Sequence, residues 1–331
     1  MTAVKFHAGI DVGSTTVKAV VQDAGTGATL WKDYRRHNTR QMETLLDFLR
    51  RMEADTGMRP DNCRVFMTGS GGTLPAEIIG AKYVQEVLAS SLSVEQRCPE
   101  ASSFVEIGGQ DAKIVILRKD PETGRVKKIP SMNDKCAGGT GSIIDKIAAK
   151  LGIPLAELCT LRYRGLRVFP VAGKCGVFAE TDINGLQKQG VGAEELMASL
   201  FEAFVLQNLK VLARGHTLLP HVLLLGGPNA FIPGMQEAWQ HNIALMWADR
   251  GVALPEGATP EQLVRAPEDA EYYGALGAIE FGKEEDVEIG RYRGLSGLEN
   301  LVNDRSAGRR RGGQGTPALV ESDTELAEFL E

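Results

Sequence analysis

Residues 4–21 read VKFHAGIDVGSTTVKAVV, an apolar run, a turn of small polar residues and a second apolar run. This pattern predicts two strands joined by a tight turn, since β-branched residues favour strands while glycine and serine favour turns. Residues 103–117 read SFVEIGGQDAKIVIL and repeat the pattern. The repetition predicts an internally duplicated α/β fold with two subdomains.

Further elements are expected after each of the two hairpins. Apolar runs predict strands, and helical spacing of apolar residues predicts helices. The expected strands cover 29–34, 64–68, 126–129 and 221–225, and the expected helices cover 40–56, 142–151, 193–214 and 273–281. In open α/β sheets, loops that follow such strands gather at one crevice, which is the usual ligand site. We therefore expect a ligand cleft between the two subdomains.

The composition describes a globular protein and excludes two classes of partner. The chain has 331 residues, 43% of them hydrophobic, and a formal net charge of −6. A negative chain lacks the basic face that general nucleic-acid binding requires, and no apolar run approaches the ~20 residues that span a bilayer. The N-terminus has no signal-peptide organisation, and five cysteines do not form a secreted disulfide framework. We expect a protein of the reducing cytoplasm with neither nucleic acid nor membrane as partner.

The first turn carries the groups that bind phosphate. Asp11 ends the first strand with a carboxylate, and the turn adds backbone N–H groups, hydroxyls and an ammonium group from Gly13, Ser14, Thr15, Thr16 and Lys18. Phosphate oxygens require such donors, and a phosphate-bound Mg²⁺ takes one or two carboxylates, often through water. The second turn repeats the arrangement with Glu106, Gly108 and Gly109. These residues predict an ATP site in which Asp11 and Glu106 hold Mg²⁺ through water.

Two further groups complete the expected nucleotide site. Gln110 is a candidate for orienting the attacking water in place of a base. The loop that contains Gly226, Gly227 and Asn229 follows a buried strand and allows an adenosine to lie flat against the backbone. Each loop alone is a weak signal, whereas the three loops in this order are a strong one. Asp11, Glu106 and Gln110 are the expected catalytic residues.

Two of the five cysteines stand out by their context. Cys136 and Cys175 each lie in a glycine-containing turn just before a helix-like stretch. Thiolates are favoured at helix N-termini, but two of them cannot complete a four-sulfur metal site. Two copies of the chain could complete one, which makes a metal site shared across a dimer interface the first hypothesis. The remaining three, Cys63, Cys98 and Cys159, are expected to be buried small hydrophobes.

The order of the loops resembles the sugar kinase, actin and heat-shock chaperone ATPase superfamily. That resemblance implies a duplicated ribonuclease H-like fold with two subdomains around a nucleotide cleft. Within the superfamily, residues 133–141, NDKCAGGTG, and residues 175–182, CGVFAETD, resemble one branch closely. That branch contains the activator ATPases of 2-hydroxyacyl-CoA dehydratases and the related ATPase subunits of benzoyl-CoA reductase. The resemblance spans about residues 5–282.

The resemblance implies an ATPase that acts as a one-electron donor. A homodimer would hold one [4Fe–4S] cluster with Cys136 and Cys175 of each subunit, and ATP binding and hydrolysis to ADP would drive the electron onward. Ferredoxin or flavodoxin would supply the electron. An iron–sulfur dehydratase, a benzoyl-CoA reductase-like enzyme or a double-cubane cluster protein would accept it. A zinc site with four cysteines is the rival interpretation of the pair. A small-molecule kinase and a chaperone-like reactivating ATPase remain as alternative functions.

Two departures from the family pattern bear on the organisation of the chain. Glu106 stands where many members have aspartate, and residues 68–72 lack the aromatic residue and arginine common in the short activators. Together with the tail beyond residue 282, these departures resemble the long activator-like proteins that carry two ATPase modules, and the resemblance implies that this chain would be one such module. The expected divisions are a first subdomain over 1–102, a second over 103–270, a closing helix over 271–282 that returns to the first, and a tail or linker over 283–331 with an acidic helix near 319–330.

Overall fold

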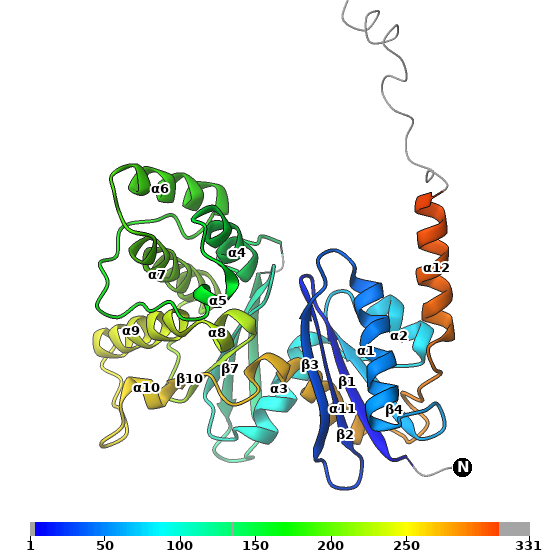
Figure 1. Ribbon diagram of the computed structural model, residues 1–331. Coiled ribbons are helices and arrows are strands. Elements are labelled where there is room, and N and C mark those ends of the chain that lie inside the picture. The colour runs from blue at the N-terminus through cyan, green and yellow to red at the C-terminus, as the bar shows by residue number, and fades with distance from the viewer. Residues whose placement is uncertain (1–3, 134, 311–331) are drawn as a thin grey trace, which may run out of the picture.

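The computed structural model describes residues 4–133 and 135–310 and shows two lobes, each built on a five-stranded sheet (Figure 1). In the first lobe the strand order is β3-β2-β1-β4-β5. The bounds are Phe6–Val12 for β1, Thr16–Asp23 for β2, Thr29–Arg36 for β3, Cys63–Thr68 for β4 and Lys82–Tyr83 for β5. Strands β1, β2 and β3 pair antiparallel, while β4 and β5 continue the sheet in parallel.

The second lobe repeats this topology strand for strand, with the order β8-β7-β6-β9-β10. Its strands are β6 (Ser103–Ile107), β7 (Ala112–Lys119), β8 (Val126–Asn133), β9 (Val222–Leu225) and β10 (Val264–Arg265). The first three pair antiparallel, and β6, β9 and β10 pair in parallel. The predicted duplication is therefore confirmed, and each pair of equivalent turns lies at the same edge of its sheet.

Helices cover the faces of both sheets, whose central strands β1, β4, β6 and β9 are buried on both faces. The helices of the first lobe and of the junction are α1 (Gln41–Thr56), α2 (Thr73–Ile79), α3 (Glu86–Arg97), α11 (Tyr273–Lys283) and α12 (Ser296–Arg310). Those of the second lobe are α4 (Gly141–Lys150), α5 (Leu155–Leu158), α6 (Gly176–Lys188), α7 (Ala193–Leu212), α8 (Gly227–Phe231), α9 (Pro233–Asp249), α10 (Pro260–Leu263) and the short 3₁₀ helix η1 (Ala270–Tyr272). The expected helices at 40–56, 142–151, 193–214 and 273–281 correspond to α1, α4, α7 and α11.

Helices α3 and α11 lie between the two lobes and pack closely on each other (Figure 1). A Cβ atom at Gly277 of α11 would lie 1.7 Å from the carbonyl oxygen of Ala89 in α3, so only glycine permits this approach. Gly9 of β1 serves in the same way, because a Cβ there would lie 2.0 Å from the carbonyl oxygen of Ala275. The first lobe is therefore built from two separate stretches of sequence, joined along this helix pair.

The structure corrects the expected tail, because the chain from about residue 290 packs on the first lobe. Tyr292 is 2% exposed and Leu298 is fully buried, both in the core that α1 forms with the first sheet. The Tyr292 hydroxyl donates to Glu53 Oε1 at 2.9 Å, and Arg50 pairs with Glu299 at 2.7 Å. Charged residues surround these few apolar positions, which is why the composition suggested a linker. The acidic helix expected near 319–330 lies outside the described residues.

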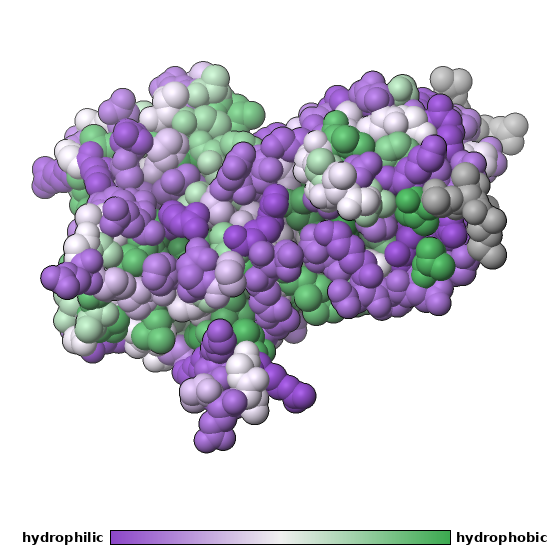
Figure 2. Space-filling model, turned by 90° about the horizontal axis from the view of Figure 1, so that it is seen from below, coloured by the Kyte–Doolittle hydropathy of each residue, from purple (hydrophilic) through white to green (hydrophobic). Residues whose placement is uncertain are grey.

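The surface seen from below is mostly hydrophilic over both lobes (Figure 2). Within the described part of the chain, no helix combines the length and the apolar character that crossing a membrane requires.

Candidate functional site

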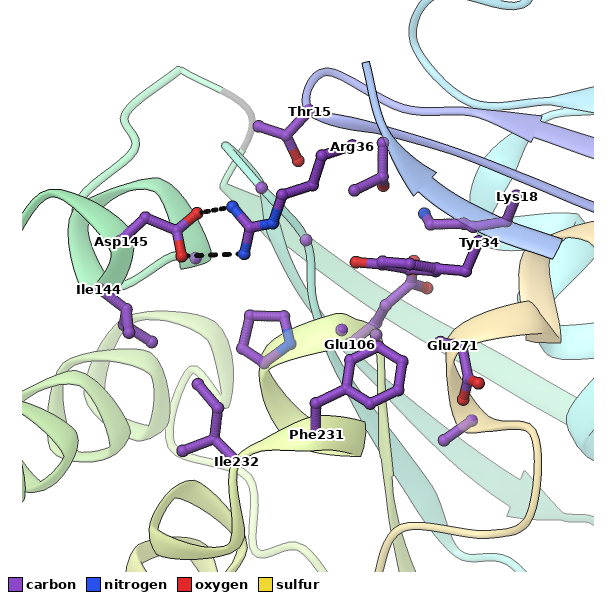
Figure 3. A pocket seen from close by; sticks show the side chains of 18 of the residues that line it. Thr15, Lys18, Tyr34, Arg36, Glu106, Ile144, Asp145, Phe231, Ile232 and Glu271 are labelled. Carbon is purple, nitrogen blue, oxygen red and sulfur yellow. Dashed lines mark hydrogen bonds and ion pairs between the residues drawn. The ribbon is translucent and has the colours of Figure 1, made fainter. Parts of the chain in front are cut away.

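A cleft of about 250 Å³ opens between the lobes, and the three predicted glycine loops line it (Figure 3). The first loop joins β1 to β2, the second joins β6 to β7, and the third leads from β9 into α8. A smaller polar recess adjoins the cleft and shares part of its wall. The shared residues are Asp11, Thr15, Thr16, Lys18, Glu106, Gly108, Gly109 and Gly274. Gly13 and Ser14 line the recess, while Gly226 and Gly227 line the wider part.

The first loop presents a lysine–carboxylate pair to the recess. Asp11 is 8% exposed at the end of β1, and its Oδ2 lies 2.7 Å from Lys18 Nζ on β2. Burial alone would lower the pKa of Lys18, but the Asp11 carboxylate raises it above its ordinary value. The Gly13 N–H donates to the Thr16 carbonyl at 2.9 Å and closes the turn. Lys18 therefore stays protonated, and the turn holds its hydroxyls beside the recess.

A buried lysine that was not predicted from the sequence lies on β7, two residues after the second loop. Lys113 on β7 is 2% exposed, and its Nζ lies 2.6 Å from Glu86 and 2.6 Å from Asp111. It also lies 3.3 Å from Glu106, whose other oxygen accepts a hydrogen bond from Ser90 at 2.8 Å. Burial alone would lower the pKa of Lys113, but the three carboxylates raise it well above its ordinary value. Burial raises the pKa of Glu86.

The recess has the charge that suits a divalent cation bound to phosphate. Four carboxylates, Asp11, Glu86, Glu106 and Asp111, face only two ammonium groups, Lys18 and Lys113. This excess of negative charge opposes a bare triphosphate and favours one that carries Mg²⁺. Asp11 and Glu106 each already contact a lysine, and the contact of their carboxylates with Mg²⁺ through water stays a prediction that this donor set allows. The residues present therefore fit a hydrated magnesium ion.

The wider part of the cleft has apolar walls that suit a flat aromatic base. The apolar residues that line it include Ile144, Leu155, Leu158, Pro228, Phe231 and Ile232. Tyr34 meets Phe231 edge to face with the ring centroids 5.2 Å apart (Figure 3). Gly226 has a φ of +85°, and a Cβ at Gly227 would lie 2.5 Å from the Tyr34 hydroxyl oxygen. Glycine at these two positions lets the loop lie directly against the Ile107 carbonyl and the Tyr34 hydroxyl, with no room for a larger residue.

Two ion pairs join the lobes at the cleft. Arg36 of β3 forms a bidentate pair with Asp145 of α4, one of its bonds measuring 3.0 Å (Figure 3). Lys32 of the same strand lies 2.5 Å from Asp269, just before η1. The hydrogen bond with Asp145 raises the pKa of Arg36. Strand β3 is thus tied to the second lobe at two points.

Two predicted nucleotide residues lie elsewhere. Asn229 is fully buried, and its Nδ2 donates to the carbonyl of Leu225 at 3.0 Å while its Oδ1 accepts from Trp239 Nε1 at 3.1 Å. Its side chain therefore fixes α8 on the second sheet and is not free to contact adenosine. Gln110 is exposed and is absent from the lining of both parts of the cleft, so this conformation gives it no catalytic contact.

The loops that carry Cys136 and Cys175 touch each other. Cys136 is exposed between β8 and α4, and Cys175 is half-buried at the N-cap of α6. A Cβ at Gly138 would lie 2.4 Å from the carbonyl oxygen of Lys174, so the loops approach as closely as glycine permits. The Gly138 N–H also donates to Cys136 Sγ at 3.4 Å. Such N–H···S contacts and glycine loops fit an iron–sulfur cluster.

One copy of the described chain does not hold a complete metal site. Across residues 4–133 and 135–310, no group of three or more histidine, cysteine and acidic side chains is placed to bind a metal. Of the other cysteines, Cys63 and Cys98 are buried as expected, and burial raises the pKa of Cys63. Cys159 is a correction, because it is only partly buried and lines the wide part of the cleft.

The phosphate loop and the first cysteine loop are joined by backbone hydrogen bonds. The Gly141 N–H donates to the Gly108 carbonyl at 3.0 Å, and the Ser142 N–H donates to the Gly109 carbonyl at 2.8 Å. A Cβ at Gly141 would also lie 2.9 Å from Pro228 Cγ, at the adenosine loop. The start of α4, five residues after Cys136, therefore contacts both glycine loops of the second lobe.

Comparisons with known proteins agree with this geometry. The profile of the BadF/BadG/BcrA/BcrD ATPase family matches residues 8–238. The 2-hydroxyisocaproyl-CoA dehydratase activator of Clostridioides difficile is 26% identical over 223 residues, which cover 67% of this chain and 80% of that protein. The (R)-2-hydroxyglutaryl-CoA dehydratase activating ATPase of Acidaminococcus fermentans is 26% identical over 273 residues, which cover 82% and 95%.

Solved structures show the same fold. The structure of the activator of 2-hydroxyisocaproyl-CoA dehydratase from Clostridium difficile with bound ADPNP superimposes with a TM-score of 0.66 at 22% identity, covering 91% of this chain and 97% of that one. Component A of the Acidaminococcus fermentans (R)-2-hydroxyglutaryl-CoA dehydratase gives a TM-score of 0.64 at 24% identity, covering 83% and 96%.

Proposed function

The chain belongs to the BadF/BadG/BcrA/BcrD ATPase family, and on this premise we propose that it is an ATP-dependent one-electron donor. ATP binding and hydrolysis in the cleft would change the position of the cysteine loops and so drive electron transfer to an iron–sulfur partner. The observation that carries the proposal is the pair of backbone hydrogen bonds from Gly141 and Ser142 to the carbonyls of Gly108 and Gly109. These bonds give the phosphate loop a direct contact with the start of α4, through which a change at the phosphates can reach the Cys136 loop.

In this proposal, different residues of the cleft bind the phosphates, the metal ion and the base of ATP. Lys18 and the N–H groups and hydroxyls of the first loop would bind the phosphates, and Asp11 and Glu106 would hold a hydrated Mg²⁺, which neutralises phosphate charge when bound. Tyr34 and Phe231 hold the base in the wider part. Hydrolysis joins a water oxygen to the γ-phosphorus and breaks its bond to the bridging oxygen, which leaves ADP and phosphate. ATP and ADP differ by the γ-phosphate, and a γ-phosphate in contact with the Gly108–Gly109 loop would favour a different lobe arrangement from ADP.

Cys136 and Cys175 are the residues that would hold a [4Fe–4S] cluster, with the same pair from a second copy. Such a cluster supplies one-electron redox chemistry when bound. A homodimer is supported by the first turn of α6, where Val177 is 64% and Phe178 is 65% exposed directly after Cys175. Two large apolar side chains beside a metal-ligating loop favour burial against another surface. The second copy would then cover them and complete the four thiolates.

The proposed partners are inferred from the named functions of the relatives. Activators of dehydratases that act on 2-hydroxyacyl-CoA substrates match most of this chain, and one of the subunits of the benzoyl-CoA reductase of Thauera aromatica is 24% identical over 282 residues. We therefore propose an iron–sulfur dehydratase, a reductase of that kind or a double-cubane cluster protein as the electron acceptor. A ferredoxin or flavodoxin of the cytoplasm would be the donor, giving up one electron for each electron passed on.

The test is anaerobic purification of the full chain, followed by assays of iron, sulfide and ATP hydrolysis. We expect about four irons per dimer and loss of that iron in both Cys136→Ala and Cys175→Ala. Cys159→Ala is the matched control and should keep its iron, because Cys159 lies in the cleft and not in the cysteine loops. A colourless dimer containing zinc, or full iron content in either cysteine-loop variant, would refute the cluster.

The same preparation separates the two alternatives. A small-molecule kinase requires a free carboxylate to act as general base, and Asp111, the candidate in the sequence, is held 2.6 Å from Lys113. Phosphorylated product and colourless protein would favour the kinase. A reactivating ATPase without a cluster would hydrolyse ATP equally well in the two cysteine variants and contain no iron in the wild type.

A further inference from the structure

Thr140 lies fully buried between the second phosphate loop and the first cysteine loop. Its Oγ1 is 3.0 Å from the carbonyl oxygen of Gly109 and 2.6 Å from the carbonyl oxygen of Ala137. A threonine hydroxyl has a single proton, so it donates to one of these carbonyls at a time. The side chain is therefore placed to hydrogen-bond either to the phosphate loop or to the cysteine loop.

Neither carbonyl is left without a donor when the hydroxyl turns to the other. Gly109 also accepts from the Ser142 N–H at 2.8 Å, and Ala137 also accepts from the Thr140 N–H at 3.2 Å. The usual penalty for an unsatisfied buried carbonyl is thus absent in both arrangements. The two arrangements differ by the quality of one neutral hydrogen bond, which is what a two-state element requires.

The Thr140 side chain does not cap α4, although Thr140 is the N-cap residue of that helix. It is the N-cap residue of α4, with extended backbone angles of φ −125° and ψ 172°, yet its side chain makes no capping hydrogen bond. A threonine at this position usually accepts from the N–H of the second or third helical residue. Here the hydroxyl points instead toward the two loops.

Each of the two carbonyls belongs to a segment that leads to a functional group. Gly109 packs against the first phosphate loop, since a Cβ there would lie 2.2 Å from Thr15 Oγ1. Ala137 precedes Gly138, whose N–H donates to Cys136 Sγ and whose Cα packs on the carbonyl of Lys174. Gly109 lines both parts of the cleft, so a phosphate bound between the two phosphate loops would contact it, whereas a movement of Ala137 would reach both cysteines.

The cysteine loop is held on α7 at Gly139, which lies between Ala137 and Thr140 in the sequence. Asn208 on α7 is 2% exposed and donates to the Gly139 carbonyl at 3.0 Å and to the Phe204 carbonyl at 3.0 Å. Gly139 has a φ of +77°, a conformation that favours glycine. The loop is therefore anchored to α7 at Gly139, and residues on either side can turn about that anchor.

We propose that Thr140 is a positioning residue that couples phosphate occupancy at Gly109 to the placement of Cys136. When the bound nucleotide changes, the Thr140 hydroxyl switches its hydrogen bond from one of these two acceptors, the carbonyls of Gly109 and Ala137, to the other. The inference rests on the proposed function in one respect, that the cleft binds ATP and ADP. Beyond that function, the inference names the Thr140 hydroxyl as the group through which a change of nucleotide in the cleft alters the position of Cys136.

The test measures the alkylation rate of Cys136 by iodoacetamide in the full-length, cluster-free chain, with peptides resolved by mass spectrometry. Rates are compared without nucleotide, with Mg-ADP and with a non-hydrolysable ATP analogue. In the wild type we expect nucleotide to change the rate by about threefold to tenfold, the range that one neutral hydrogen bond supports. Thr140→Val should bind nucleotide and show the same Cys136 rate in all three conditions. Thr140→Ser, which keeps the hydroxyl, should restore the difference.

The controls separate the relay from the fold and from the proposed function. Thr181→Val removes a hydroxyl that donates to the Val177 carbonyl on α6, away from the phosphate loop, and should behave as the wild type. Protection of Cys159, which lines the cleft, reports nucleotide occupancy in the same samples. If Cys159 is protected and Thr140→Val still shows the nucleotide effect at Cys136, or if the wild type shows none, the relay is refuted while nucleotide binding stands. If wild-type Cys159 is never protected and no nucleotide binds, the proposed function fails as well.

Discussion

At the scale of single residues, His7 shows how burial sets the response of the protein to pH. It lies on β1 and is 8% exposed, with its ring edge to face with Phe66 at a centroid distance of 6.2 Å. Burial, followed by the charges of Arg64 and Lys283, lowers the pKa of His7 to about 4. The folded protein therefore holds this imidazole neutral over a range in which the unfolded chain would protonate it.

The first prediction concerns acid stability. A group whose folded pKa is lowered contributes stability above its unfolded pKa and loses it as the pH falls toward the folded pKa. Between about pH 6.5 and pH 4 we expect His7 to account for a loss of up to about 3 kcal/mol in the free energy of unfolding. His7→Phe should flatten this part of the curve in urea unfolding at several pH values. His241→Gln, on the exposed side of α9, is the control; an unchanged slope in His7→Phe would contradict the assignment.

The sequence predicted that a residue lines the cleft only where that residue lies next to a glycine turn. Asp11, Lys18 and Glu106 flank such turns, and the structure places all three at the recess. Lys113 and Glu86 escaped notice because Glu86 comes from the start of α3, a contact that no local pattern encodes. The sequence did hold one signal, a lysine inside the apolar run of β7. A charge within such a run indicates a buried ionic partner.

At the scale of elements, the contact between α3 and α11 depends on one glycine. Gly277 brings the two backbones together with no room for a side chain, since a Cβ would fall 1.7 Å from the carbonyl oxygen of Ala89. The backbone carbonyl cannot rotate away as a flexible side chain would. The two helices must therefore separate if any larger residue replaces Gly277.

The second prediction tests this contact by overpacking. Gly277→Ala should lower the free energy of unfolding by about 2 kcal/mol or more, measured from urea unfolding midpoints. Gly185→Ala is the matched control, because Gly185 also lies within a helix, α6, but has open space around its Cβ position. The control should gain about 0.5–1 kcal/mol from the reduced freedom of the unfolded chain. Equal effects of the two substitutions would show that the close approach does not matter.

Helices and strands were predicted correctly where apolar residues recur at regular spacing. They were missed where charged residues outnumber the apolar ones. The apolar face of α1, which includes Met42, Leu45, Leu49 and Met52, was predicted from spacing and is buried. The segment 290–304 lies in the stretch 283–331, which was expected to be a tail or linker because glutamate, arginine and glycine are frequent in it. Its few apolar residues nevertheless pack on the first lobe. The surface that receives them is formed by α1 and α2, so local composition could not reveal it.

At the scale of the whole molecule, the ion pair of Arg36 and Asp145 links the lobes across the mouth of the cleft. Their side chains are 39% and 33% exposed, so solvent screens the pair and its strength is that of a surface ion pair. It nevertheless joins β3 of the first lobe to α4, the helix that follows the Cys136 loop. Opening of the cleft must break this contact.

The third prediction is that the pair slows nucleotide release. Arg36→Gln and Asp145→Asn should each speed ADP dissociation by about twofold to fivefold, and the double variant should add little more. Stopped-flow release of a fluorescent ADP analogue measures the rates. Arg35→Gln and Asp47→Asn are the matched control, because this pair, at 2.7 Å, lies within the first lobe. Additive effects at Arg36 and Asp145 would mean that the two side chains do not act together.

The packing of α11 on Gly9 of β1 also bears on the order in which a nascent chain folds. The second sheet is formed by one continuous stretch, residues 103–265, whereas the first lobe needs both its N-terminal strands and α11, whose backbone packs on Gly9. A ribosome that adds about 5–20 residues per second takes roughly 10–40 s to pass from residue 100 to residue 300. During that interval the N-terminal strands emerge without their packing partner, and the later lobe completes its structure first.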